Sequence, residues 1–153
     1  MDPLNVYAVE GSNLSFGVMR ERWLLCLLPS GRYIAYPDAK VGPGKYGNCI
    51  HYKGIDQATN KWVTLETFGG KLVENITQAV ARDCLAQVLL ILNDDLSYRP
   101  VFHVHDEVIC EVPKDKAQER LEVIEKAFAT PAPWAEGLPL KGAGYLTDFY
   151  LKD

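Results

Sequence analysis

The chain has 153 residues, of which 48% are hydrophobic and 24% are charged, as in an ordinary globular domain with its own core. No run of about 18 or more apolar residues is present, so we expect no membrane-spanning helix and a cytoplasmic location. The net charge of −4 argues against a stand-alone nucleic-acid binder, but it leaves room for a local basic stripe. The four cysteines form no Cys-x-x-Cys pair, which argues against a structural zinc site.

Residues 1–16 show no regular spacing of apolar residues. We expect them to form an N-terminal lead-in to a single domain over residues 17–153. Short apolar runs bounded by turn residues predict four strands, at 23–28, 32–36, 49–52 and 61–65. Residues 37–46 contain two prolines and several glycines, which predict a loop.

The second half of the chain alternates between helical and extended patterns. Apolar residues spaced by three and four predict helices over 70–92 and 114–128. Alternating apolar residues over 100–113 predict a hairpin, and residues 138–151 are expected to be extended. The element order therefore predicts an α+β fold, in which helices flank an antiparallel sheet.

Two groups of residues are candidates for chemistry. The first is a polar stripe on the predicted helix at 70–92, formed by Lys71, Asn75, Gln78 and Arg82. Such a stripe is either a solvated face or a row of hydrogen-bond donors along a nucleic-acid backbone. His51, in a short aromatic strand, is interpreted as structural.

The second group lies near the tip of the predicted hairpin, where the sequence reads His103-Val104-His105-Asp106-Glu107. In a strand, His103 and His105 would share a face. Imidazole ligands would suit a transition metal, and the carboxylates would suit a hard cation. The alternative is an acidic hairpin tip with two hydrogen-bonded histidines and no metal. A small metal-dependent hydrolase using His103, His105 and Asp106 also remains open.

Five blocks of the sequence, in order, resemble the phage-type branch of the family A DNA polymerases. The triplet His105-Asp106-Glu107 between apolar strands is similar to motif C of that family. The segment 67–83, TFGGKLVENITQAVARD, is similar to the palm helix of the branch. The other blocks are 28–32, 61–62 and 133–140. The resemblance covers about residues 17–153 and implies a palm-type sheet within a family A polymerase hand.

The resemblance also implies roles for individual residues. Asp106 would be a catalytic residue and a ligand of the paired Mg²⁺ ions of nucleotidyl transfer, with Glu107 as an auxiliary catalytic acid. His105 would contact the primer terminus and Gln78 the primer–template. We add Lys71, Asn75 and Arg82 as further DNA-binding residues because they share the helical stripe with Gln78. Trp62 and Trp134 are expected to anchor the core, and His103 is assigned to packing.

Two parts of the family pattern have no counterpart in this sequence. Neither Asp38 nor Asp56 has the flanking pattern of the first metal-ligating aspartate, and the fingers helix that holds the dNTP is missing. We therefore expect no polymerase activity from the chain alone. The expected partners are primer–template DNA, a dNTP, and a second polymerase chain with the remaining palm, fingers, thumb and exonuclease. The chain would then be a subunit of a split polymerase or a fragment; a non-enzymatic palm remnant that binds DNA or a replisome protein is the alternative.

Overall fold

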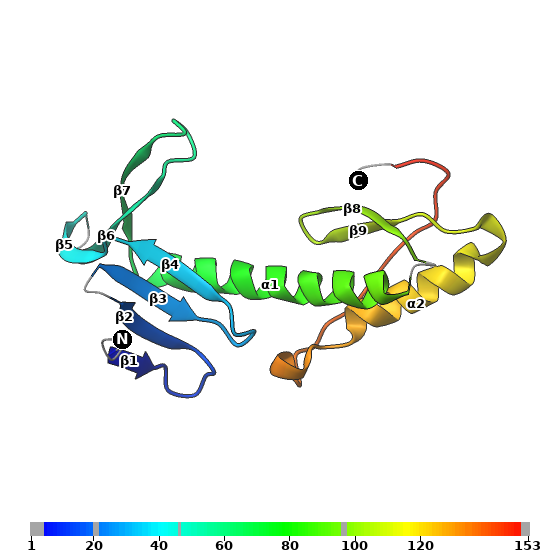
Figure 1. Cartoon of the computed structure of the whole chain (residues 1–153), viewed down its shortest axis with the longest axis horizontal. Coiled ribbons are helices and arrows are strands. Elements are labelled where there is room, and N and C mark those ends of the chain that lie inside the picture. Colours follow the sequence, from blue (N-terminus) through cyan, green and yellow to red (C-terminus); the bar gives the residue numbers. More distant parts are fainter. Residues whose placement is uncertain (1–4, 20–21, 46, 96–97, 151–153) are drawn as a thin grey trace. The chain divides into compact units, whose positions relative to one another are not determined.

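A computed structural model describes residues 5–19, 22–45, 47–95 and 98–150 of the chain (Figure 1). The chain divides into two compact units, Met1–Val80 and Ala81–Asp153, and each is described by itself. Within the described residues the structure contains antiparallel sheets and two α-helices, which confirms the predicted α+β class. Neither of these helices is both long and apolar enough to cross a membrane.

The N-terminal unit contains a four-stranded antiparallel sheet, in the order β1-β2-β3-β4. Its strands are β1 (Asn5–Ala8), β2 (Ser15–Met19), β3 (Trp23–Leu27) and β4 (Tyr33–Pro37). The apolar run of β3 reverses through a turn in which Gly31 has φ +85°, a conformation that glycine adopts without steric cost. The strands expected at 23–28 and 32–36 are thereby confirmed.

A second antiparallel sheet in the same unit has the order β5-β6-β7. Its strands are β5 (Lys40–Gly44), β6 (Gly47–Ile55) and β7 (Trp62–Thr67). The two sheets meet at β4 and β6, where the rings of Tyr36 and Tyr52 pack edge to face with centroids 5.1 Å apart. Cys26, Leu28 and Tyr36 are buried in the core of this unit.

The sequence-based description of this unit was wrong in three places. Strand β1 lies inside the expected lead-in and pairs with β2 along its whole length; residues 1–4 lie outside the described residues. Strand β5 lies inside the expected loop, because an edge strand needs few backbone donors and therefore tolerates Pro43. Trp62 is 62% exposed in this chain and does not anchor its core.

Helix α1 (Gly69–Asp94) begins in the N-terminal unit and continues into the C-terminal unit. Its bounds agree with the predicted helix to within two residues at each end. In the N-terminal unit, the Arg32 guanidinium donates a hydrogen bond of 3.1 Å to the Ala79 carbonyl, and Asn75 Nδ2 donates one of 3.3 Å to the Tyr36 hydroxyl. These two bonds tie β4 and the turn before it to the helix.

The C-terminal unit combines the end of α1 with a hairpin and a second helix. The hairpin consists of β8 (Pro100–Val104) and β9 (Glu107–Cys110), followed by a short 3₁₀ turn η1 (Lys114–Lys116), helix α2 (Ala117–Ala129) and a second 3₁₀ turn η2 (Pro133–Ala135). Among its described residues, Val88, Leu92, Tyr98 and Ala127 form a buried cluster in its core. The Arg120 guanidinium lies 4.8 Å from the centre of the Tyr98 ring, close enough for a cation–π contact.

The C-terminal segment after η2 packs closely on α2 through two glycines. A Cβ atom on Gly142 would lie 2.7 Å from the Glu125 carbonyl oxygen, and one on Gly144 would lie 2.6 Å from Leu121 Cδ1. The Gly144 amide donates a hydrogen bond of 2.8 Å to Glu125 Oε1. The segment has no regular helix or strand through residue 150, so the extended conformation expected from the sequence stays a prediction.

Candidate active site

The β8–β9 hairpin carries the acidic triplet at its tip, as the sequence predicted. Val104 pairs with Glu107, so His105 and Asp106 form a two-residue turn between the strands. His105 has φ +49°, whereas Asp106 has no positive φ, the combination found in type II′ hairpin turns. Glycine is the usual residue at the first position of such a turn, and a side chain in that conformation costs of order 1–3 kcal/mol.

The strained turn presents its two side chains to solvent. His105 and Asp106 are exposed, and Glu107 is partly buried at the start of β9. Because His105 lies in the turn and not in β8, the strand alternation expected to put His103 and His105 on one face does not extend to it. His103 is itself exposed in this chain and is not packed in a core, contrary to its assignment to packing.

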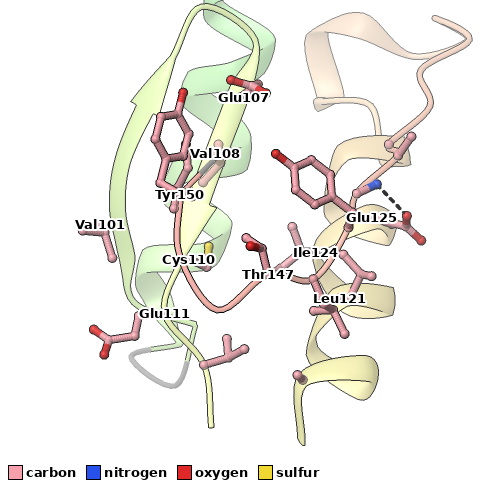
Figure 2. A pocket seen from close by; sticks show the side chains of 18 of the residues that line it. Val101, Glu107, Val108, Cys110, Glu111, Leu121, Ile124, Glu125, Thr147 and Tyr150 are labelled. Carbon is pink, nitrogen blue, oxygen red and sulfur yellow. Dashed lines mark hydrogen bonds between the residues drawn. The ribbon is translucent and has the colours of Figure 1, made fainter. Parts of the chain in front are cut away.

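A groove in the C-terminal unit reaches the acidic triplet. Asp106 and Glu107 line it at the hairpin, Leu121 and Ile124 line it on α2, and the C-terminal segment completes it (Figure 2). Figure 2 shows that Glu107 and Tyr150 both lie among the lining side chains, with the hydrogen bond of Glu125 on the opposite wall. The hairpin therefore borders a recess that is lined by both apolar and polar side chains, with Asp106 and Glu107 at the turn.

The hairpin differs from the cluster of metal-ligating side chains elsewhere in the described part of the chain. Within the described residues, one group of three His, Cys, Asp or Glu side chains brings its ligand atoms within 4.8 Å of one another, and it consists of Cys49, His51 and Glu66. The hairpin residues are not part of it. Asp106 and Glu107 offer carboxylate oxygens, the ligand type that hard cations such as Mg²⁺ prefer.

The residues of the predicted polar stripe all lie on α1, but they differ in their surroundings. Lys71 and Gln78 are exposed in the N-terminal unit, and Arg82 is exposed in the C-terminal unit. Asn75 is half-buried, and its side chain is used in the bond to Tyr36. The structure therefore leaves Lys71, Gln78 and Arg82 accessible to a ligand, and gives Asn75 a packing role that the sequence did not indicate.

The sequence of the chain is similar to part of a known protein. Over 132 residues, 85% of its length, the chain is 46% identical to a protein of Bacillus phage SP02 named DNA polymerase. The chain spans 20% of the length of that relative. The similarity is to one segment of a phage DNA polymerase. No family model matches the chain, and no solved structure matches it.

The similarity to a phage polymerase agrees with the resemblance that the sequence motifs indicated. Sequence reasoning missed two features of the structure: the cluster of Cys49, His51 and Glu66, and the contact between the rings of Phe102 and Tyr150. The sequence did contain a sign of the cluster, because Cys49 and His51 are two residues apart in a predicted strand and so share a face. It contained no sign of the ring contact, because Phe102 and Tyr150 are 48 residues apart.

Proposed function

We propose that this chain is a palm segment of a family A DNA polymerase and contributes one part of the catalytic site for nucleotidyl transfer. The 46% identity to the phage DNA polymerase over most of the chain supports this proposal most strongly. The exposed Asp106 at a tight hairpin tip supports it further, because a metal ligand in such a site must be accessible to both primer and nucleotide.

Each residue of the hairpin has a distinct role in this proposal. Asp106 is a carboxylate ligand, and Glu107 beside it supplies a second negative charge that favours cation binding. Bound Mg²⁺ would lower the pKa of the primer 3′-hydroxyl and stabilise charge on the phosphoryl oxygens. His105, exposed in the strained turn, contacts the primer terminus as a hydrogen-bond donor or acceptor.

The exposed part of the α1 stripe holds the DNA. Gln78 donates and accepts hydrogen bonds near the primer–template, and Lys71 and Arg82 contact phosphate oxygens. These three side chains are exposed, as contacts to a ligand require. Phosphate contacts position the DNA without reading its sequence, which suits an enzyme that must accept every template.

The site needs a partner because one aspartate does not hold two magnesium ions in reacting geometry. The chain spans a fifth of the related phage polymerase, so the remaining palm, the fingers for the dNTP, the thumb and the exonuclease would come from further polymerase sequence. We propose that this sequence is on a second chain or on the remainder of a longer one. Primer–template DNA, a dNTP and Mg²⁺ are then ligands of the assembled enzyme.

Primer extension with Mg²⁺ and dNTPs tests this proposal. The chain would be assayed alone and mixed with the remaining segments of a polymerase from the same source. Extension in the mixture alone is the expected result. Asp106→Asn should abolish extension, whereas Asp115→Asn, a matched change at another exposed acid, should leave it unchanged. Assembly with no extension, or extension by the Asp106→Asn variant, would contradict the proposal.

A further inference from the structure

A cluster of three metal-ligating side chains lies on the β5-β6-β7 sheet, separate from the hairpin. Cys49 and His51 are two residues apart in β6, so their side chains leave the strand on the same face. The register of β6 and β7 places Glu66 directly opposite His51. Two neighbouring strands thus bring a thiol, an imidazole and a carboxylate together on one face of the sheet.

The distances within the cluster suit a small divalent ion. Cys49 Sγ lies 3.4 Å from His51 Nε2, and one ligand atom from each of Cys49, His51 and Glu66 lies within 4.8 Å of the other two. Glu66 Oε1 also lies 3.9 Å from the other ring nitrogen of His51, Nδ1. Zinc–sulfur and zinc–nitrogen bonds of about 2.3 Å and 2.0 Å in a tetrahedral site place sulfur and nitrogen about 3.5 Å apart. The thiol and imidazole are therefore already spaced as two ligands of one ion, and the exposed side chain of Glu66 can turn toward it.

Strand β5 makes room for the cluster through its glycines. A Cβ atom on Gly42 would lie 3.0 Å from His51 Cδ2, and one on Gly44 would lie 2.6 Å from Cys49 Sγ. The two ligand side chains therefore lie directly over the backbone of β5. The carbonyl oxygen of Pro43 in that strand is 3.1 Å from His51 Nε2, which places a further oxygen beside the cluster.

The charges of the cluster also favour a cation. A divalent ion would bind the Cys49 thiolate and neutralise the nearby Glu66 carboxylate. Thiolate and imidazole ligands select Zn²⁺ over Mg²⁺, which prefers oxygen.

We propose that Cys49, His51 and Glu66 bind one Zn²⁺ ion, with a water molecule or the Pro43 carbonyl at the fourth position. The ion would join β6 to β7 and hold both against the glycine-containing strand β5. This site is independent of the hairpin and of the proposed polymerase function.

Cobalt titration of the full chain tests the site directly. Co²⁺ takes the place of Zn²⁺ in such sites, and a thiolate ligand gives it an intense charge-transfer absorption that imidazole and carboxylate ligands do not. The chain, freed of metal by a chelator and kept reduced, should bind one equivalent with this absorption. Zn²⁺ should displace the cobalt, and a large excess of Mg²⁺ should not. Zn²⁺ should also raise the melting temperature of the chain.

Two variants and one control assign the ligands. Cys49→Ser should remove the thiolate absorption, and Glu66→Gln should weaken cobalt binding by at least about tenfold, a loss that even residues behind the ligands can produce. Cys84→Ser, a change at another partly exposed free thiol, should change neither the thiolate absorption nor the affinity for cobalt. Circular dichroism checks that each variant folds. The Glu66 side chain is 55% exposed, so Glu66→Gln is expected to fold even if Cys49→Ser does not, and it then tests the site by itself.

Three results would overturn the zinc site: no thiolate absorption at saturating Co²⁺, absorption that persists in a folded Cys49→Ser variant, or displacement by Mg²⁺. The readouts involve no DNA and no partner chain. A failed zinc titration would therefore leave the polymerase proposal untouched, and a failed primer extension would leave the zinc site untouched.

Discussion

The ring of Tyr150, near the end of the chain, packs edge to face on the ring of Phe102 in β8, with their centroids 5.0 Å apart. This contact joins the C-terminal segment to the hairpin that carries Asp106. The same segment is fastened to α2 by the Gly144–Glu125 hydrogen bond and to η1 by an ion pair of 2.9 Å between Lys114 and Asp148. The hairpin is thereby braced by a segment that follows it by some 40 residues along the chain.

A double-mutant cycle measures the interaction free energy between Phe102 and Tyr150. Replacing Phe102 and Tyr150 by leucine, singly and together, should give a coupling free energy of about 0.5–1.5 kcal/mol, the usual value for an aromatic pair. Chemical denaturation supplies the four unfolding free energies. Phe149, which is 68% exposed, is the control: the cycle of Phe102→Leu with Phe149→Leu should show no coupling. Equal coupling in the two cycles would contradict a specific contact.

Because the turn is strained at His105, replacing this residue by glycine should increase stability but decrease activity. His105→Gly should raise the unfolding free energy by about 1 kcal/mol, because glycine adopts the positive φ without steric cost. The same change should lower primer extension by the assembled polymerase, since the imidazole is lost. Thermal unfolding and primer extension measure the two effects.

A matched change elsewhere separates strain at His105 from a general glycine effect. Asn60 also has a positive φ, of 54°, but asparagine tolerates this conformation better than histidine. Asn60→Gly should therefore stabilise the chain less and leave extension unchanged. A destabilised His105→Gly variant would show that the turn is not strained.

Two neighbouring positions on α1 should respond to substitution in opposite ways. Asn75→Ala removes the hydrogen bond to Tyr36 and should lower the unfolding free energy by about 0.5–1.5 kcal/mol. Gln78→Ala, at an exposed position, should change it by less than about 0.5 kcal/mol but weaken primer–template binding by the assembled polymerase. Urea denaturation and fluorescence anisotropy with labelled DNA measure the two quantities. Unchanged DNA binding in Gln78→Ala would remove Gln78 from the DNA interface.

The turn before β7 predicts a pH dependence of stability. The hydroxyl and the amide of Thr59 both donate hydrogen bonds to Asp56 Oδ1, of 2.7 and 2.8 Å, and they lower the pKa of Asp56 below its ordinary value of 3.8. A carboxyl group with a lowered pKa in the folded state stabilises the fold above its unfolded pKa, and this contribution is lost as the pH falls through the folded value.

Thr59→Ala tests this pH dependence. The melting temperature of the variant should fall below that of the unaltered chain at neutral pH, and the gap should narrow as the pH drops through 3.8 and below. Gln57→Ala, at an exposed position in the same turn, should show no such pH-dependent gap. A gap that stays constant over the titration would assign the effect of Thr59 to something other than the ionised carboxylate.

The sequence alone determined the features that depend on local patterns. Apolar spacing of three and four placed α1 and α2, and alternation placed the hairpin, because side-chain periodicity is a property of the chain segment itself. The position of Asp106 at the hairpin tip followed for the same reason. The resemblance to polymerases was likewise carried by contiguous motifs.

Only the tertiary structure decided the features that depend on pairing between distant segments. Strand β1 is short and becomes a strand by pairing with β2, and β5 is an edge strand that tolerates Pro43 because its outer side has no ladder to complete. Asn75 meets Tyr36 across 39 residues. The cluster of Cys49, His51 and Glu66 exists because the β6–β7 register sets Glu66 opposite His51; a shift of one residue would turn Glu66 to the other face of the sheet.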